Sequence, residues 1–131
     1  MSHVATVNCQ ITDLAALEQA LTKFAGTALK QGQKSFQYYA SSKAPCIHAI
    51  TVPGTKYEVG LRQKSTNPAD GFEFACDFYD GGVARTFGPE LLHLRNEYQA
   101  QVAETWASRR GHRVQRVIDT PQQIQLQVTT R

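Results

Sequence analysis

Cysteine is scarce in this sequence and does not occur in a metal-binding or redox motif. The 131 residues include only Cys9, Cys46 and Cys76, and no two of them form a C-x-x-C pair. This absence excludes a zinc ribbon and a thioredoxin-type redox motif. We expect all three thiols to be free and to pack as small hydrophobic side chains.

Other motifs that signal chemistry are missing too. Neither G-x-x-x-x-G-K-S/T nor G-x-G-x-x-G occurs, which excludes nucleotide binding through those two phosphate loops. No G-x-S-x-G or cysteine-protease sequence surrounds a nucleophile, so we predict no catalytic residue and no cofactor, which favours a protein that is not an enzyme. No apolar run approaches the roughly 20 residues of a membrane span. No secretory signal is visible at the amino terminus, and the expected location is the cytoplasm.

The composition is typical of a globular protein. Hydrophobic residues make up 41% of the chain and charged residues 19%. A chain of this size buries about two-thirds of its surface on folding. We therefore expect a single α+β domain over residues 1–131, with a core that requires neither a disulfide nor a metal.

The charges are unevenly distributed along the chain. Residues 1–65 hold seven basic and three acidic side chains, residues 66–104 hold two and seven, and residues 105–131 hold five and one. Oppositely charged regions steer and orient protein partners. This distribution therefore favours a binding partner over a small substrate.

Apolar spacing predicts two helices and a set of strands. Stripes of apolar residues three or four positions apart predict helices at residues 13–25 and 89–110. Asp13 suits the N-cap of the first helix, and Pro89 suits the first turn of the second. Residues 27–34 are expected to be a polar connection. Alternating apolar residues predict strands at 3–11, 36–40, 46–52, 57–62, 72–78, 113–119 and 124–129.

Strands grouped between two helices indicate the α+β class. We expect an antiparallel or mixed sheet with two helices on one face. The nearest common architecture is the ferredoxin-like split β-α-β arrangement.

Four arginines gather where the second helix is expected to end, namely Arg109, Arg110, Arg113 and Arg116. Guanidinium groups form paired hydrogen bonds to phosphate, so this cluster is a candidate nucleic-acid site. It is equally a candidate for docking onto an acidic protein surface, including that of a second copy. The alternative is that the cations only complement the dipole of the helix C-terminus.

The last predicted strand alternates Ile124, Leu126 and Val128 with uncharged polar residues. If it lies at the edge of a sheet, it lacks the charges that discourage pairing with another chain. It is then a candidate interaction edge. The alternative is a paired strand whose outer face is merely neutral.

Cys46 and His48 share a face if both lie on one strand, and with Cys9 or Cys76 they could form a thiolate–imidazole metal site. The alternative is a core cysteine beside a half-exposed histidine, because no second ligand pair has metal-site spacing. We therefore predict no metal ligand. Glu73 and Asp77 are expected on the outward face of their strand, where carboxylates are ordinary solvated groups.

The amino-terminal block resembles a known family. Its matching positions are Ser2, His3, Ile11, Asp13, Leu14, Leu17, Ala20 and Leu21. They resemble small conserved proteins of unknown function from cyanobacteria, plastids, other bacteria and phages, whose members begin Met-Ser-His-Phe or Met-Ser-His-Val. Weaker similarity continues at residues 57–60, 72–77 and 91–98, whereas residues 31–54 depart from the family pattern.

The resemblance implies no established activity, substrate or catalytic residue. Bacterial members of the family occur beside an AAA-type ATPase, so the resemblance implies an accessory or adaptor role. With the residue-level arguments, it favours a non-enzymatic adaptor or assembly protein that acts through a protein partner or as a homo-oligomer, without membrane contact. Two alternatives stay open: a nucleic-acid-binding protein that uses the four arginines, and a small metal or redox protein around Cys46 and His48.

Overall fold

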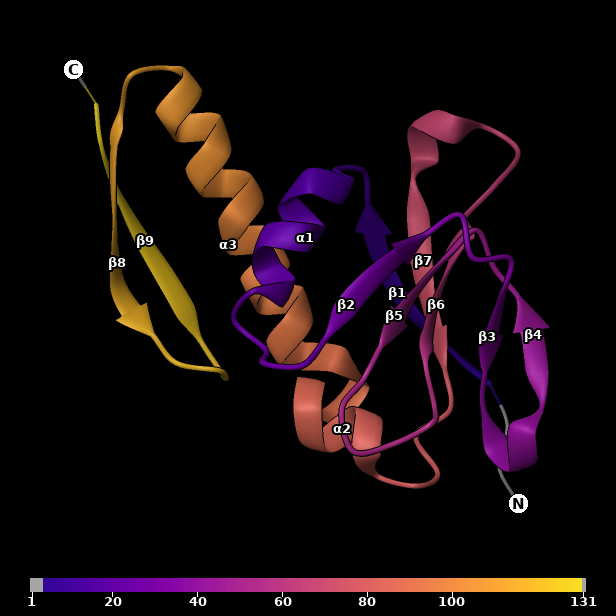
Figure 1. The fold of residues 1–131 in the computed structure, drawn as a ribbon. Helices are drawn as coiled ribbons and strands as arrows, with labels where there is room; N and C mark the ends of the chain where they lie inside the picture. The colour runs from indigo at the N-terminus through magenta and orange to yellow at the C-terminus, as the bar shows by residue number, and fades with distance from the viewer. Residues whose placement is uncertain (1–3, 131) are drawn as a thin grey trace.

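A five-stranded antiparallel sheet forms the centre of the protein (Figure 1), as described for residues 4–130 by a computed structural model. In order across the sheet, the strands are β1 (Ala5–Ile11), β7 (Phe72–Cys76), β6 (Val59–Gln63), β5 (His48–Thr51) and β2 (Ala28–Gln31). The α+β class predicted from the sequence is confirmed. A ferredoxin-like arrangement is not confirmed, because this five-stranded sheet is larger than the sheet of that fold. Ser2 and His3, which contribute to the family resemblance, lie outside the described residues.

Three helices cover one face of the sheet, namely α1 (Leu14–Leu21), α2 (Gly82–Phe87) and α3 (Leu92–Arg109). Asp13 is the N-cap of α1, as predicted, and its side chain accepts a hydrogen bond from the Ala16 N–H at 3.0 Å. The Tyr98 hydroxyl of α3 accepts hydrogen bonds from the backbone N–H groups of Thr12 and Asp13. The start of α1 is therefore anchored to the middle of α3. None of the helices in the described part of the chain has the length and apolar character needed to cross a membrane.

The protein has a core on each face of the sheet. The larger core lies between the sheet and the helices, where Leu17, Phe74 and Leu94 are fully buried. The smaller core lies on the opposite face under a separate hairpin of β3 (Ser35–Gln37) and β4 (Lys43–Pro45). Its buried members are Phe36, Cys46, Ala49 and Ala75. The three cysteines are free, as predicted.

The chain ends in a hairpin that does not join the main sheet. Its strands, β8 (Arg113–Asp119) and β9 (Ile124–Thr129), pair with each other and pack against α3 (Figure 1). We call this hairpin the C-terminal arm. The alternation of apolar residues correctly predicts both strands. It does not predict that they lie apart from the other strands.

Two predictions within the sheets are wrong. The polar connection expected at residues 27–34 contains β2, because the half-buried Leu29 packs on the larger core and the backbone pairs with β5. The strand expected at residues 36–40 ends earlier, because Ala40 and Ser41 adopt positive φ angles of 53° and 65° in a 3-10 turn. In both cases a contact or a local backbone conformation overrides the apolar pattern.

The helical region also differs from the prediction. The six residues of α2 are too few to show a helical stripe, and the spacing does not predict this helix. Pro89 begins a single 3-10 turn instead of the long helix, because Glu90 and Leu91 have φ angles of 52° and 59°. The long helix therefore begins at Leu92.

A histidine at the start of β5 predicts a pH dependence of stability. The His48 Nδ1 atom accepts a hydrogen bond from the Gly32 N–H at 3.0 Å, and its ring meets the Phe72 ring edge-on with the centroids 5.1 Å apart. Burial lowers the pKa of His48. The unfolded chain therefore binds the proton more readily, so the stability from neutral His48 is present above about pH 6.5 and is lost as the pH falls.

Denaturation of wild type and His48→Gln between about pH 8 and pH 5 tests this dependence. The glutamine retains an acceptor but does not titrate. We expect wild type to lose stability on acidification across this window and the variant to lose less. An equal pH slope in the two proteins contradicts the prediction.

Candidate interaction surface around the C-terminal arm

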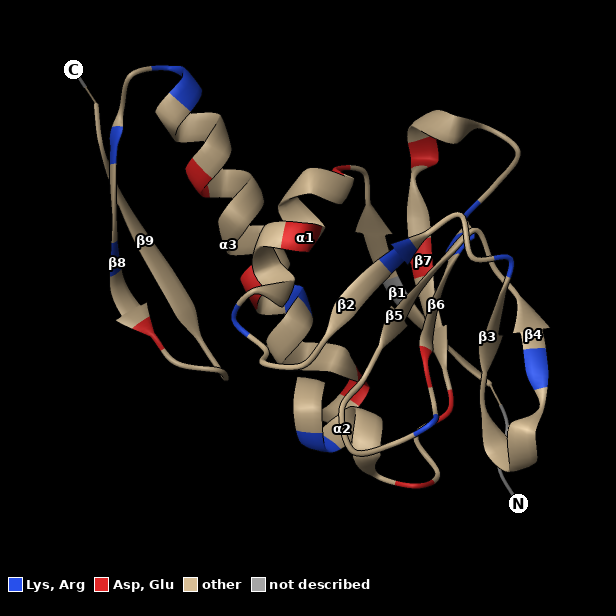
Figure 2. Ribbon diagram, viewed as in Figure 1, with Lys and Arg blue, Asp and Glu red and all other residues tan. Residues whose placement is uncertain are grey.

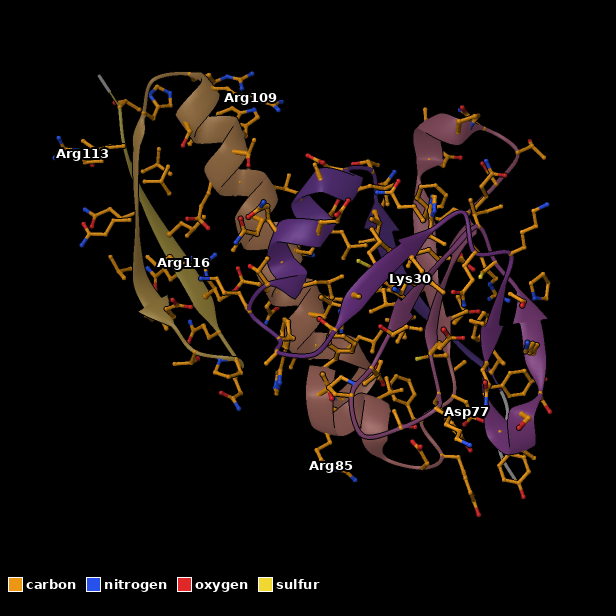
Figure 3. All side chains as sticks on the ribbon, viewed as in Figure 1. Lys30, Asp77, Arg85, Arg109, Arg113 and Arg116 are labelled. Atoms are coloured by element: carbon orange, nitrogen blue, oxygen red, sulfur yellow. The ribbon has the colours of Figure 1, made fainter. Side chains whose placement is uncertain are left out.

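Three of the four predicted arginines gather at the tip of the arm. Arg109 is the last residue of α3 and Arg110 is its C-cap, Gly111 reverses the chain with a φ angle of 75°, and Arg113 begins β8. All three arginines are exposed, and Figures 2 and 3 show this basic tip at the end of α3. The Arg110 guanidinium lies 4.0 Å from the centroid of the Trp106 ring. Within residues 4–130, none of the three forms an ion pair.

Arg116 lies instead in an ion-pair network between the arm and α3. Its guanidinium donates hydrogen bonds to both carboxylate oxygens of Glu97 at 2.9 and 2.6 Å and to Glu104 at 2.6 Å. It also reaches Asp119 at 3.2 Å. Its side chain is only 14% exposed. The structure therefore places Arg116 in an internal connection and not on the exposed basic tip (Figure 3).

The ion-pair network favours the charged forms of Glu97 and Arg116. Burial raises the pKa of the Glu97 carboxyl, but the hydrogen bonds from Arg116 and Gln101 and the charge of Arg116 outweigh it, and the resulting pKa is below the ordinary value. The hydrogen bond to Glu97 raises the pKa of Arg116. Both groups are therefore charged at neutral pH, and the pair joins β8 to α3 electrostatically.

Two of the three apolar residues of β9 are half-buried against α3, and the third is exposed. Ile124 and Leu126 are half-buried, while Val128 is 43% exposed. The alternating Gln125 and Gln127 are exposed. The predicted interaction residues therefore form the side of β9 that faces α3, and only its last apolar side chain is open to solvent.

A groove runs along α3 between the arm and the main sheet, and we call it the α3 groove. The part next to the arm is lined by Asn96, Gln99, Ala100, Ala103, Ile124 and Leu126. The adjoining part is an open hollow of about 410 Å³, and its lining residues are Gln10, Thr12, Tyr98, Gln99, Val102, Ala103 and Trp106. The two parts share Gln99 and Ala103, and none of the lining residues is charged. The groove therefore has α3 as its floor, β9 as one wall and the end of β1 as the other.

Trp106 is the residue of this surface that the sequence pattern misplaces. Its spacing from Tyr98 and Val102 predicts a place on the buried stripe of the helix, yet it is 53% exposed. A step of four residues exceeds the 3.6 residues of one helical turn, so repeated steps drift around the helix. At Trp106 the apolar stripe therefore faces the α3 groove and no longer the core.

The side chains of Cys46 and His48 each make a hydrogen bond within the protein. The Cys46 thiol donates a hydrogen bond to the carbonyl oxygen of Gln33 at 3.1 Å, and burial raises its pKa. The Nδ1 atom of His48 accepts a hydrogen bond from the Gly32 N–H at 3.0 Å. In the part of the chain that the structure describes, no group of three or more histidine, cysteine or acidic side chains could hold a metal ion.

Asp77 is buried, and its predicted position on the outward face is wrong. Only 2% of the residue is exposed. Its Oδ1 accepts a hydrogen bond from the Tyr79 N–H at 2.9 Å, while its Oδ2 has no partner among the described residues. The carboxylate closes a turn where β7 ends, so the strand alternation no longer determines its direction.

Comparison with protein-family models, curated proteins and solved structures finds no match. The resemblance to the family that begins Met-Ser-His therefore stays a prediction.

Proposed function

We propose that this protein is a non-enzymatic adaptor or assembly protein that acts through protein–protein contacts made by the C-terminal arm and the α3 groove. One observation carries the proposal: an uncharged strand edge lies beside an uncharged groove that contains an exposed tryptophan. Protein interfaces are depleted of charge at their centres and enriched in aromatic residues. An AAA-type ATPase is the partner that the family resemblance suggests.

Replacing Trp106 in full-length bait tests this proposal. Wild type is used to retain proteins from an extract of its host, and retained proteins are identified and quantified. Trp106→Ala is expected to reduce retention of the partner about thirtyfold, the effect of removing an aromatic residue that contributes about 2 kcal/mol to binding. Tyr79→Ala is a matched control, because Tyr79 is 60% exposed and does not line the groove. Equal retention by both variants, or no protein retained by wild type, contradicts the proposal.

A second candidate function is nucleic-acid binding by the basic tip. It is favoured by the exposure of Arg109, Arg110 and Arg113 and by their lack of ion pairs in residues 4–130. If the tip contacts phosphates, oligonucleotide affinity falls steeply with salt. The variant Arg110→Ala/Arg113→Ala is then expected to reduce the salt slope by about two. An unchanged slope excludes this function.

A further inference from the structure

The strands of the C-terminal arm differ in how their edges are protected. β8 carries Arg113, Arg116 and Asp119, whereas β9 carries no charged residue over Ile124–Thr129. Charged side chains are a common protection of a strand edge against pairing with another chain. The arm is therefore protected along β8 and unprotected along β9.

The nearest edge of the main sheet has a different kind of protection. The pairing of β1 with β7 shifts register between Val7 and Ile11, and such irregularities discourage further strand addition. Of the two edges that flank the α3 groove, β9 is therefore the one open to pairing.

The edge of β9 faces the α3 groove. Ile124 and Leu126 line the groove together with Gln99 and Ala103 of α3. The exposed Trp106 lies in the adjoining part. A strand that pairs with β9 therefore covers the uncharged surface of α3 that lies beside Ile124 and Leu126.

The sequence of β9 is complementary to itself. In an antiparallel pair centred on Leu126, this residue faces its own copy, Ile124 faces Val128, and Gln125 faces Gln127. Apolar side chains then meet on the face toward α3, and polar side chains meet on the outer face. No like charges oppose each other.

The spacing of the helices also fits two copies. Neighbouring strands lie about 4.8 Å apart, so the midlines of two arms joined through β9 are about 10 Å apart. Each arm packs on its own α3, and α-helices pack at about 8–10 Å. The exposed Gln99 and Ala103 lie where the two α3 helices meet.

We propose that two copies of this chain associate about a two-fold axis through antiparallel pairing of their β9 strands. The product is a four-stranded sheet, β8–β9–β9–β8, over both α3 helices, and it covers the part of each α3 groove that lies next to the arm. The dimer rests on the proposed function, because it makes a second copy of the chain one of the proteins that the arm binds.

Size-exclusion chromatography with light scattering on the full chain at about 100 µM tests the dimer. Wild type is expected to have twice the 14.5 kDa mass of one chain. Gln125→Lys/Gln127→Lys places like charges opposite each other twice and is expected to weaken the dimer about tenfold or more. Gln125→Glu/Gln127→Glu is expected to do the same. An equimolar mixture of the two variants is expected to restore a dimer, which misfolded proteins could not do.

The matched control places the same charges on the other strand of the arm. Gln115 lies directly opposite Gln127 in the ladder, and Gln115 and Val117 are both exposed. Gln115→Lys/Val117→Lys is therefore expected to leave the dimer intact. A monomeric wild type, a monomeric control or a mixture that stays monomeric overturns the proposal.

The outcome is distinguishable from failure of the adaptor function. A monomeric wild type that still retains a partner through Trp106 overturns the dimer and leaves the adaptor function standing. A dimer that depends on β9 and retains no host protein supports this inference and contradicts the adaptor function.

Discussion

Replacing Arg116 by alanine is expected to lower the free energy of unfolding by about 3–5 kcal/mol. The guanidinium connects the arm to α3 through Glu97, Glu104 and Asp119. Removing it leaves Glu97, which is only 6% exposed, without its counter-charge. A buried charge that has lost its partner costs far more than the pair itself contributes, and this asymmetry sets the size of the effect.

Urea denaturation at neutral pH measures this loss, with Arg113→Ala as the control. Arg113 belongs to the same strand but is exposed and forms no ion pair within residues 4–130. Its replacement is expected to change the free energy of unfolding by about 0.5 kcal/mol or less. The double variant Arg116→Met/Glu97→Gln is expected to recover part of the loss, because it removes both charges. Similar losses for Arg116→Ala and Arg113→Ala would falsify the role assigned to the network.

Acid should weaken the same connection. The pKa of Glu97 lies below its ordinary value because the hydrogen bonds from Arg116 outweigh the effect of burial. The stability from this carboxylate is fully present above the ordinary glutamate pKa of about 4.3 and is lost as the pH falls through the pKa of the folded protein. In Arg116→Ala only the burial effect and weaker contacts remain, so this acid-dependent loss is expected to shrink.

Replacing Phe36 by alanine is expected to lower the free energy of unfolding by about 3–5 kcal/mol. Phe36 is fully buried and is the only large side chain among the four buried residues of the smaller core. Its neighbours Cys46, Ala49 and Ala75 are small and cannot fill the space that it leaves. The loss therefore includes both the burial of the ring and the cavity that remains.

The close approach of Phe36 to Gly60 provides a second test, in which a methyl group is added to the smaller core instead of a ring being removed. A Cβ on Gly60 would clash with the Cδ1 atom of the Phe36 ring. Gly60→Ala is therefore expected to cost about 1–3 kcal/mol through overpacking. In the double variant Gly60→Ala/Phe36→Ala the ring is gone, so the combined loss should be smaller than the two single losses together.

An exposed aromatic residue of the same region is the control for this pair. Tyr39 is 44% exposed, and its ring meets Tyr79 edge-on with the centroids 5.3 Å apart. Tyr39→Ala is expected to cost about 1 kcal/mol. Thermal or urea denaturation that finds Phe36→Ala no more destabilising than Tyr39→Ala contradicts the existence of a second core.

Local patterns were sufficient for the regular elements that have one apolar face. Asp13 before a spacing of three and four apolar residues correctly predicts the start of α1. Alternation correctly predicts β8 and β9, and the absence of charge in β9 is visible without coordinates. These features depend on residues close together in the chain, where helical and strand periodicity applies directly.

The candidate site depended on contacts between distant parts of the chain. Arg116 and Glu97 are 19 residues apart, and no periodicity links a strand residue to a helix residue in this way. Periodicity also fails for Trp106 and Asp77. Trp106 lies off the buried stripe of its helix, and Asp77 turns inward where its strand ends. The basic cluster predicted from four neighbouring arginines therefore divides into an exposed tip of three and one arginine, Arg116, that is paired with acidic side chains.

Residue order alone is enough to establish an α+β protein with free cysteines, no familiar catalytic motif and an uncharged final strand. Only folding in three dimensions decides that this strand lies in an arm beside α3, with its edge along an uncharged groove. The physical reason is that periodicity assigns each residue to a face of its own element. Which face meets which depends on packing over long sequence distances.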